Sequence, residues 1–161
     1  MQNFLNPVEF RFSIKRLPNV EYYIQGIDVP GISSSSTDIP TPFKTLHAPG
    51  DKLTYNDLTL TVLADENLKS YRDTFDWLVA VTSPDSFEQY AGLLAGDGVY
   101  SDATLTILNS NKNANIELQF KDLFPIEVSQ ISLSTTQSDV VAPTFSVTFK
   151  HAGYYIKVKD D

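Results

Sequence analysis

The stretch that decides the fold spans residues 48–81 and reads APGDKLTYNDLTLTVLADENLKSYRDTFDWLVAV. Its first part predicts a strand over residues 53–63, because apolar side chains and threonines alternate there with a period of two. The alternating residues are Leu58, Leu60 and Val62 on one face, and Thr59 and Thr61 on the other. We therefore expect a strand with one buried face and one wet face.

The second part predicts a helix over about residues 66–80, because the apolar period changes to that of a helix. Asp65 stands where an N-cap is expected, and Pro84 bars any continuation. Residues 82–102 predict at most a short helical turn. We therefore expect one helix, which carries the sole tryptophan and closes the hydrophobic core. Its expected core anchors are Leu68, Tyr71, Phe75, Trp77 and Leu78.

The rest of the chain predicts strands separated by turns. In this interpretation the first two strands form a hairpin, the next two form another, and Leu123-Phe124-Pro125 breaks the pattern before the fifth. The expected strands cover residues 8–16, 20–29, 103–108, 116–120, 126–136, 144–149 and 154–158. The predicted fold is mainly β: a barrel or sandwich of antiparallel strands with one flanking helix.

A long extended loop is expected over about residues 30–50, which hold four of the nine prolines. Composition alone would also fit a floppy surface loop. A solvated loop has little use for apolar side chains, however, whereas an arm that packs on a neighbouring molecule would bury them. The candidate arm residues are Ile32, Ile39, Phe43, Leu46, Pro49, Gly50 and Asp51.

The formal net charge of −8 argues against a protein that grips nucleic acid through a basic surface. In the simplest interpretation, the negative charge keeps the protein soluble. In a second interpretation, the negative charge keeps DNA from adhering to a surface past which the DNA slides. The sequence has no cysteine, which excludes disulfides and thiolate metal sites and is compatible with assembly in a reducing cytoplasm. We expect neither a membrane-spanning segment nor a secretory signal.

Several predicted strands carry uncharged hydroxyl side chains on the face opposite the apolar one. Threonine is common in strands, which explains this pattern without any function. A polar and weakly charged sheet face would also suit a wall past which something slides. The candidate residues of such a face are Thr59, Thr61, Thr104, Thr106, Ser146 and Thr148.

No catalytic, metal or cofactor site is predicted. The two histidines, His47 and His151, have no acidic or histidine partner at a metal-ligand spacing. Asp65 and Glu66 open a helix, where acidic residues serve as capping and dipole partners. No nucleophile-elbow or phosphate-binding glycine motif is present.

Several stretches together resemble the tail tube proteins of contractile-tailed bacteriophages of the T-even type. They follow the family order from about residue 8 to residue 156. The stretches are Gly26-Ile27-Asp28-Val29-Pro30-Gly31-Ile32, Gly50-Asp51 with Leu53 to Val62, Asp65-Glu66, Phe75-Asp76-Trp77, Lys121-Asp122-Leu123-Phe124-Pro125, and Phe145 to Phe149 with Tyr154-Tyr155.

This resemblance implies one structural domain over residues 1–161 and no enzyme activity. Subunits of the family form hexameric rings that stack into a hollow tube inside a contractile sheath, related to the type VI secretion tube. The partners implied are other copies of the chain, sheath protein, and baseplate and terminator proteins. The candidate hydroxyl face would line the lumen, through which DNA passes without specific binding. The implied location is the phage tail, assembled in the host cytoplasm.

Two alternatives remain at this point. The same fold serves tube-initiating and tube-terminating rings. A β-sandwich binding module of another class would instead use exposed aromatic residues as a ligand platform, and its candidates are Tyr22, Tyr23, Tyr154 and Tyr155.

Overall fold

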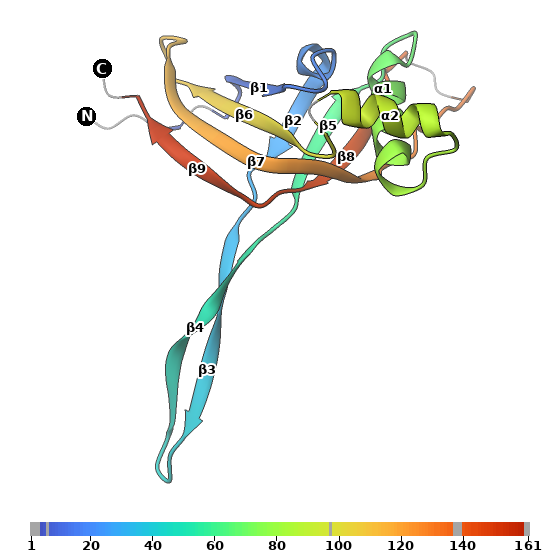
Figure 1. The fold of residues 1–161 in the computed structure, drawn as a ribbon. Coiled ribbons are helices and arrows are strands. Elements are labelled where there is room, and N and C mark those ends of the chain that lie inside the picture. The colour runs from blue at the N-terminus through green and yellow to red at the C-terminus, as the bar shows by residue number, and fades with distance from the viewer. Residues whose placement is uncertain (1–3, 6, 97, 137–139, 160–161) are drawn as a thin grey trace.

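The computed structural model describes residues 4–5, 7–96, 98–136 and 140–159. Figure 1 shows a body made of a folded sheet with helices at one end, and a long hairpin that extends away from it. The sheet of the body has seven strands in the order β1-β6-β7-β8-β5-β2, with β9 also paired to β7. All its pairs are antiparallel. The predicted mainly β sandwich is confirmed.

The sheet consists of two halves that share one strand. The first half contains β1 (Phe10–Ile14), β6 (Ser101–Leu108) and β9 (Gly153–Val158); the second contains β8 (Thr144–Lys150), β5 (Leu58–Leu63) and β2 (Ile24–Asp28). The shared strand is β7 (Ala114–Val128), which pairs with β6 and β9 through its first part and with β8 through its last part.

The predicted break at Leu123-Phe124-Pro125 is wrong, because β7 continues through it. Asp122 has a φ of 53°, and the ladder shifts register beside it and again after Pro125. Such irregularities bend a strand without ending it. The bend lets one strand serve both halves. The strand predicted over residues 126–136 ends instead at Val128.

The hydrophobic core lies between the two halves. Alternate residues of β5 are completely buried, as the period of two predicts. Apolar residues of both halves and of the helices form one cluster. Its largest fully buried side chains are Phe12, Phe120, Phe145, Phe149, Leu58, Leu60, Leu93, Leu105 and Leu123.

The predicted helix is α1 (Lys69–Thr82), which closes one end of the core. Asp65 does cap it, although three residues upstream of the geometric N-cap: its carboxylate accepts hydrogen bonds from the backbone N–H groups of Lys69 (3.1 Å) and Ser70 (3.2 Å). Burial would raise the pKa of Asp65, but these hydrogen bonds outweigh it and lower the pKa.

The core-facing side of α1 differs from the predicted stripe. Trp77 is only 3% exposed and its ring lies 5.9 Å from that of Phe149, whereas Tyr71 and Leu78 are half-buried. Leu68 and Phe75 are largely exposed, so their assignment as core anchors is wrong. The buried side of α1 carries Ser70 and Thr74 together with Trp77 and Ala80, and Thr74 donates its hydroxyl hydrogen bond of 2.9 Å to the carbonyl of Ser70.

The expectation of one helix is also wrong, because α2 (Phe87–Ala95) follows α1. Ser86 caps it by accepting a hydrogen bond from the backbone N–H of Gln89 at 3.4 Å. Leu93 anchors α2 in the core, where it is almost completely buried.

The N-terminal hairpin is a further correction. Residues 20–29 begin as a single 3-10 turn, η1 (Val20–Tyr23), before β2. The buried side chain of Val20 anchors this turn in the core, and the chain crosses there from one half of the sheet to the other. As a result β1 pairs with β6 and β2 pairs with β5, so β1 and β2 do not form the predicted hairpin.

Candidate functional site

The most prominent candidate surface is the hairpin of β3 (Ile32–Pro40) and β4 (Thr45–Tyr55), here called the arm. The extended segment predicted from the prolines is thus a strand pair, and β4 and β5 are separate strands where one was predicted over residues 53–63. Every residue of β3 is exposed. The arm therefore has no hydrophobic core of its own.

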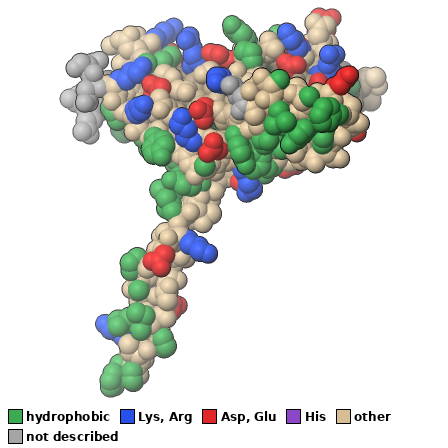
Figure 2. Space-filling model, viewed as in Figure 1, with side chains coloured by type: hydrophobic (Ala, Val, Ile, Leu, Met, Phe, Trp, Pro, Cys, Tyr) green, Lys and Arg blue, Asp and Glu red, His purple; other side chains and the backbone are tan. Residues whose placement is uncertain are grey.

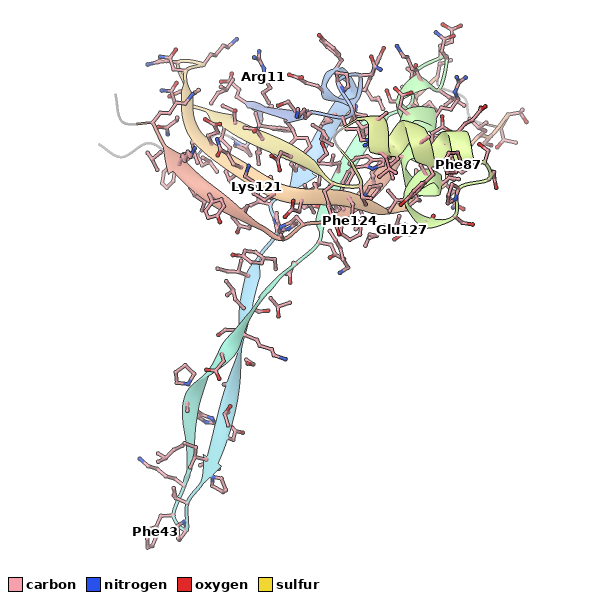
Figure 3. All side chains as sticks on the ribbon, in the orientation of Figure 1. Arg11, Phe43, Phe87, Lys121, Phe124 and Glu127 are labelled. Atoms are coloured by element: carbon pink, nitrogen blue, oxygen red, sulfur yellow. The ribbon has the colours of Figure 1, made fainter. Side chains whose placement is uncertain are left out.

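The sequence-predicted arm residues all lie on this hairpin. Ile39 pairs directly with Leu46 near its far end, and Ile32 pairs with Tyr55 at its base. Phe43 occupies the tip, as Figure 3 shows, and its side chain is 98% exposed. The remaining predicted residues are Pro49, Gly50 and Asp51 of β4. What these residues contact in another molecule stays a prediction.

Local interactions give the arm a defined shape. The pairing shifts register between Ser34 and Ser36, and a side chain at Gly50 would collide there with the backbone of Ser35. The tip is closed by hydrogen bonds from the backbone N–H of Lys44 to Thr41 Oγ1 (3.2 Å) and of Thr41 to the carbonyl of Lys44 (3.2 Å). His47 Nδ1 lies 2.6 Å from Asp38 Oδ1 across the strand pair.

The base of the arm is fixed to the body by aromatic packing. The ring of Tyr55, the last residue of β4, lies 5.7 Å from the rings of both His151 and Tyr154. Tyr154 also donates a hydrogen bond of 2.9 Å to the carbonyl of Pro30. Gly153 has a φ of 156°, and a Cβ there would approach the Tyr55 ring to 3.2 Å. Sequence reasoning missed this joint, because its residues come from distant parts of the chain.

The candidate hydroxyl face lies on the outside of the sheet in two groups. Thr59 pairs with Thr148, and Thr61 with Ser146, so that four hydroxyl side chains lie together on β5 and β8. Thr104 and Thr106 lie on β6, in the other half. All six are half-buried. The members of each group lie close together in the structure, but the two groups do not form one patch.

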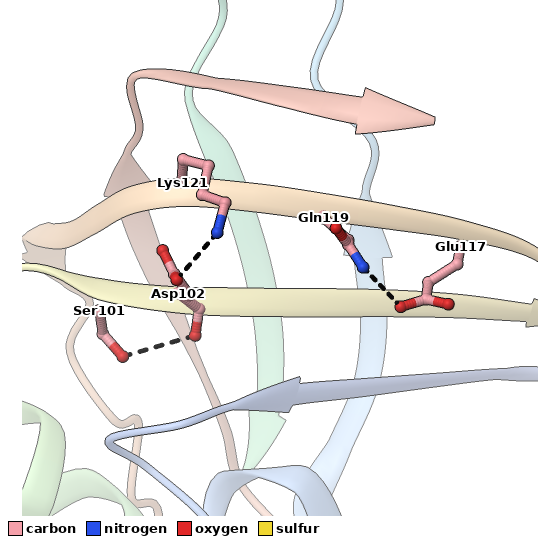
Figure 4. Close-up of polar contacts among 5 residues, drawn as sticks. All are labelled: Ser101, Asp102, Glu117, Gln119 and Lys121. Atoms are coloured by element: carbon pink, nitrogen blue, oxygen red, sulfur yellow. Dashed lines mark hydrogen bonds and ion pairs between the residues drawn. The ribbon is translucent and has the colours of Figure 1, made fainter. Parts of the chain in front are cut away.

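The surroundings of Thr104 and Thr106 are more charged than the sequence pattern predicts, because Thr104 pairs with Gln119 and Thr106 with Glu117. Figure 4 shows the polar contacts of these two partners. Lys121 Nζ lies 3.1 Å from Asp102 Oδ2, and Gln119 donates a hydrogen bond of 2.9 Å to Glu117. This hydrogen bond, aided by the charges of Lys159 and Lys157, lowers the pKa of Glu117. This half of the outer face therefore carries paired charges.

An open sheet edge forms the third candidate surface. Strand β9 pairs with β7 on one side only. It carries exposed Tyr155, Ile156 and Val158. An unprotected apolar edge in a free subunit is a template for pairing with another chain. The prediction of an edge strand over residues 154–158 is confirmed.

The two histidines lie in different parts of the molecule. His47 lies on the arm and His151 at its base. Within the described residues, no group of three or more metal-binding side chains is close enough to hold an ion. No described helix has the length and apolar character needed to cross a membrane. The arm and the β9 edge expose apolar side chains that another protein could cover.

Comparisons with known proteins agree with these features. The family model described as phage tail tube protein matches residues 6–157. No curated protein matches the sequence. A chain of the sheath–tube complex of an extracellular contractile injection system (PVC) has a similar fold, with a TM-score of 0.69 and 13% identity over 96% of this chain and 92% of that one.

Two further solved structures share the fold. A chain of the tube-terminating cap of the anti-feeding prophage has a TM-score of 0.65 and 11% identity over 99% of this chain and 94% of that one. A chain of the six-fold symmetrised baseplate of the same particle has a TM-score of 0.59 and 12% identity over 98% of each chain. At these identities the likeness concerns the fold alone.

Proposed function

The chain belongs to the phage tail tube protein family, a family of structural tube subunits, and from this premise we propose how it assembles. Six copies form a ring, and rings stack into a hollow tube. The ring size is supported by the six-fold baseplate that contains a similarly folded chain. A heterologous contact that closes after six copies gives such a ring.

The observation that carries this proposal is the arm. Its strands expose both faces to solvent. Figure 1 shows that the hairpin extends away from the body, and Figure 3 places the exposed Phe43 at its tip. An isolated two-stranded hairpin is only marginally stable in water. A second molecule that covers the arm would supply the missing burial. We therefore assign the arm to the contact between one ring and the next.

The open edge of β9 is suited to the contact within a ring. Pairing of this edge with a strand of the neighbouring subunit would satisfy its unpaired backbone groups and cover its apolar side chains. The joint of Tyr55, His151 and Tyr154 connects the arm to the start of β9. The two assembly contacts would therefore be held at a fixed angle.

The tube would conduct DNA through its lumen. The set of hydroxyl side chains made of Thr59, Thr61, Ser146 and Thr148 is the better candidate for the lumen wall, since these uncharged side chains offer DNA phosphates no ion-pairing partner. The overall charge of −8 would also discourage adhesion. Tight binding of DNA to assembled tubes at moderate salt would contradict this assignment.

The outer partners follow from the family and from the similarly folded chains. These come from a sheath–tube complex, a tube-terminating cap and a baseplate. We therefore assign sheath, terminator and baseplate proteins as partners, no enzymatic role, and a place in the tail of a virion assembled in the host cytoplasm.

A variant with a shorter arm, in which the remaining strand pairs keep their register, tests the stacking role. Replacing residues 37–48 with Asn-Gly closes the hairpin immediately after the Ser36↔Pro49 pair and leaves the arm base intact. We expect the unchanged protein to form tubes in electron micrographs. The shortened protein should form rings or free subunits, and its near-ultraviolet circular dichroism should be nearly unchanged, because residues 37–48 contain no tyrosine or tryptophan.

Two results would contradict the proposal. Normal tubes from the shortened protein would show that stacking does not use the arm. Monomers of the unchanged protein at all concentrations would favour a stand-alone binding module. Rings without tubes from the unchanged protein would instead support a terminating or initiating ring, which the similarity to the tube-terminating cap makes the second candidate.

A further inference from the structure

Helix α2 exposes an apolar surface that its packing in the body leaves uncovered. Phe87, Tyr90 and Leu94 follow one another at helical spacing and are 83%, 41% and 56% exposed. Leu93 points the other way and is buried. Figure 2 shows hydrophobic side chains gathered over this end of the body. We call Phe87, Tyr90 and Leu94 the α2 stripe.

The α2 stripe is held on a rigid support. Ser86 caps the helix, and Gln89 returns its side chain to accept a hydrogen bond of 2.9 Å from the backbone N–H of Asp85. This reciprocal arrangement resembles a capping box. A stripe presented by a capped and anchored helix loses little entropy when a partner covers it.

The tip of the arm is the second uncovered apolar surface. Phe43 projects from the closed turn of Thr41 and Lys44. In Figures 1 and 3 the tip lies far from α2 of the same chain, so the arm does not reach its own α2 stripe. The same chain thus carries an apolar projection and an apolar helix face that do not meet within one copy.

The charges beside the two surfaces are complementary. Asp85 and Glu88 lie at the start of α2, next to Phe87. Lys44 follows Phe43 directly, and the segment 39–46 contains no acidic residue. Two copies with a net charge of −8 repel each other in general, so a cationic tip is the part of one copy best suited to approach an acidic site on another.

We propose that the α2 stripe receives the arm tip of a second copy, with Phe43 against Phe87 and Leu94 and with Lys44 beside Glu88. This assignment rests on the proposed stacking of rings through the arm and names the surface that the arm meets. An apolar anchor in a hydrophobic site with a charged rim is the arrangement typical of interface hot spots.

A charge exchange tests the contact. Lys44→Glu and Glu88→Lys are each expected to raise the protein concentration needed for tube formation by about tenfold or more, because like charges then meet at the rim. The double variant Lys44→Glu with Glu88→Lys should restore most of the loss. Glu66→Lys changes the same charge at an exposed site before α1 and serves as the matched control, with no expected effect.

Cross-linking gives an independent measurement, since the natural sequence has no cysteine. A chain with Pro42→Cys and Ala95→Cys, which keeps Phe43, Phe87 and Leu94, should form a ladder of disulfide-linked oligomers when assembled tubes are oxidised. The control pairs Pro42→Cys with Tyr22→Cys, which is exposed on η1, and should form no ladder. All three sites are exposed, so the variants should fold.

The outcomes separate this proposal from the one on which it rests. If shortening the arm abolishes tubes but Glu88→Lys and Lys44→Glu do not alter assembly, the arm stacks rings through another surface and the assignment of α2 is overturned. The same holds if Glu88→Lys tubes form normally but fail to bind sheath protein. If the shortened arm still gives normal tubes, the stacking role itself fails.

Discussion

The body and the arm use the same antiparallel pairing but differ in what stabilises them. Strand β5 buries every second residue completely, whereas all nine residues of β3 are exposed. Burial of apolar area supplies most of the folding free energy of a domain. The buried core therefore stabilises the body without a partner molecule. The arm depends instead on its joint with the body, on its backbone hydrogen bonds and on the molecules that it contacts.

Removal of a core anchor should destabilise the body more than any other single change. Trp77→Ala should lower the free energy of unfolding by about 3–5 kcal/mol, because it leaves a cavity beside Phe149. It also removes the hydrogen bond of 3.3 Å from Trp77 Nε1 to the carbonyl of Val99. Phe75→Ala, on the exposed side of α1, should cost about 1 kcal/mol or less. Denaturant unfolding measures both, and equal losses would contradict the observed orientation of α1.

The second prediction concerns the joint between the two regions. Gly153→Ala should destabilise the protein by about 1–3 kcal/mol, because its Cβ would approach the Tyr55 ring to 3.2 Å at a backbone angle that favours glycine. Gly92→Ala, where a Cβ meets open space in α2, is the control and should be neutral or stabilising. Thermal unfolding distinguishes them. A neutral Gly153→Ala would show that Tyr55 moves aside at no cost and that the joint is loose.

The third prediction concerns the capping of α1 by Asp65 at the start of the helix. Asp65→Ala should cost about 1 kcal/mol at neutral pH, because two backbone N–H groups lose their acceptor. The folded-state pKa of Asp65 lies below its unfolded value, so its stabilisation is present above pH ~4 and is lost as the pH falls through the lower folded-state pKa. Asp65→Asn retains an acceptor but should lack this pH dependence. An identical acid dependence in wild type and Asp65→Asn would contradict the role of the carboxylate.

The sequence predicts the regions whose periodicity is strong and misses those decided by tertiary contacts. Alternation identifies β5 and β8, and the change to a helical apolar period identifies α1. The orientation of α1 escapes prediction because Ser70 and Thr74, which are not apolar, lie on its buried side. An apolar spacing cannot reveal such a face.

The candidate surfaces, too, can be predicted from the sequence only in part. The apolar residues of the arm are visible in the sequence, since they stand out among prolines and serines. Their pairing into a hairpin is hidden, because the run Ser33 to Ser36 has no alternation. The α2 stripe is hidden for another reason: Phe87, Tyr90 and Leu94 read as an ordinary buried face, and only the burial of Leu93 shows which side is free.

The last prediction applies one chemical change to both regions. Val62→Thr places a hydroxyl group in the completely buried face of β5 and should cost about 1–3 kcal/mol. Ile39→Thr makes the same kind of change on the exposed arm, where it should alter the unfolding free energy of the free subunit by less than about 0.5 kcal/mol. It should nevertheless weaken tube formation, since Ile39 and Leu46 form an apolar pair near the tip. Unfolding below the assembly concentration and sedimentation above it measure the two effects separately. A large loss of subunit stability from Ile39→Thr would mean that the arm contributes to folding as the body does, and the division between a self-sufficient body and a dependent arm would no longer hold.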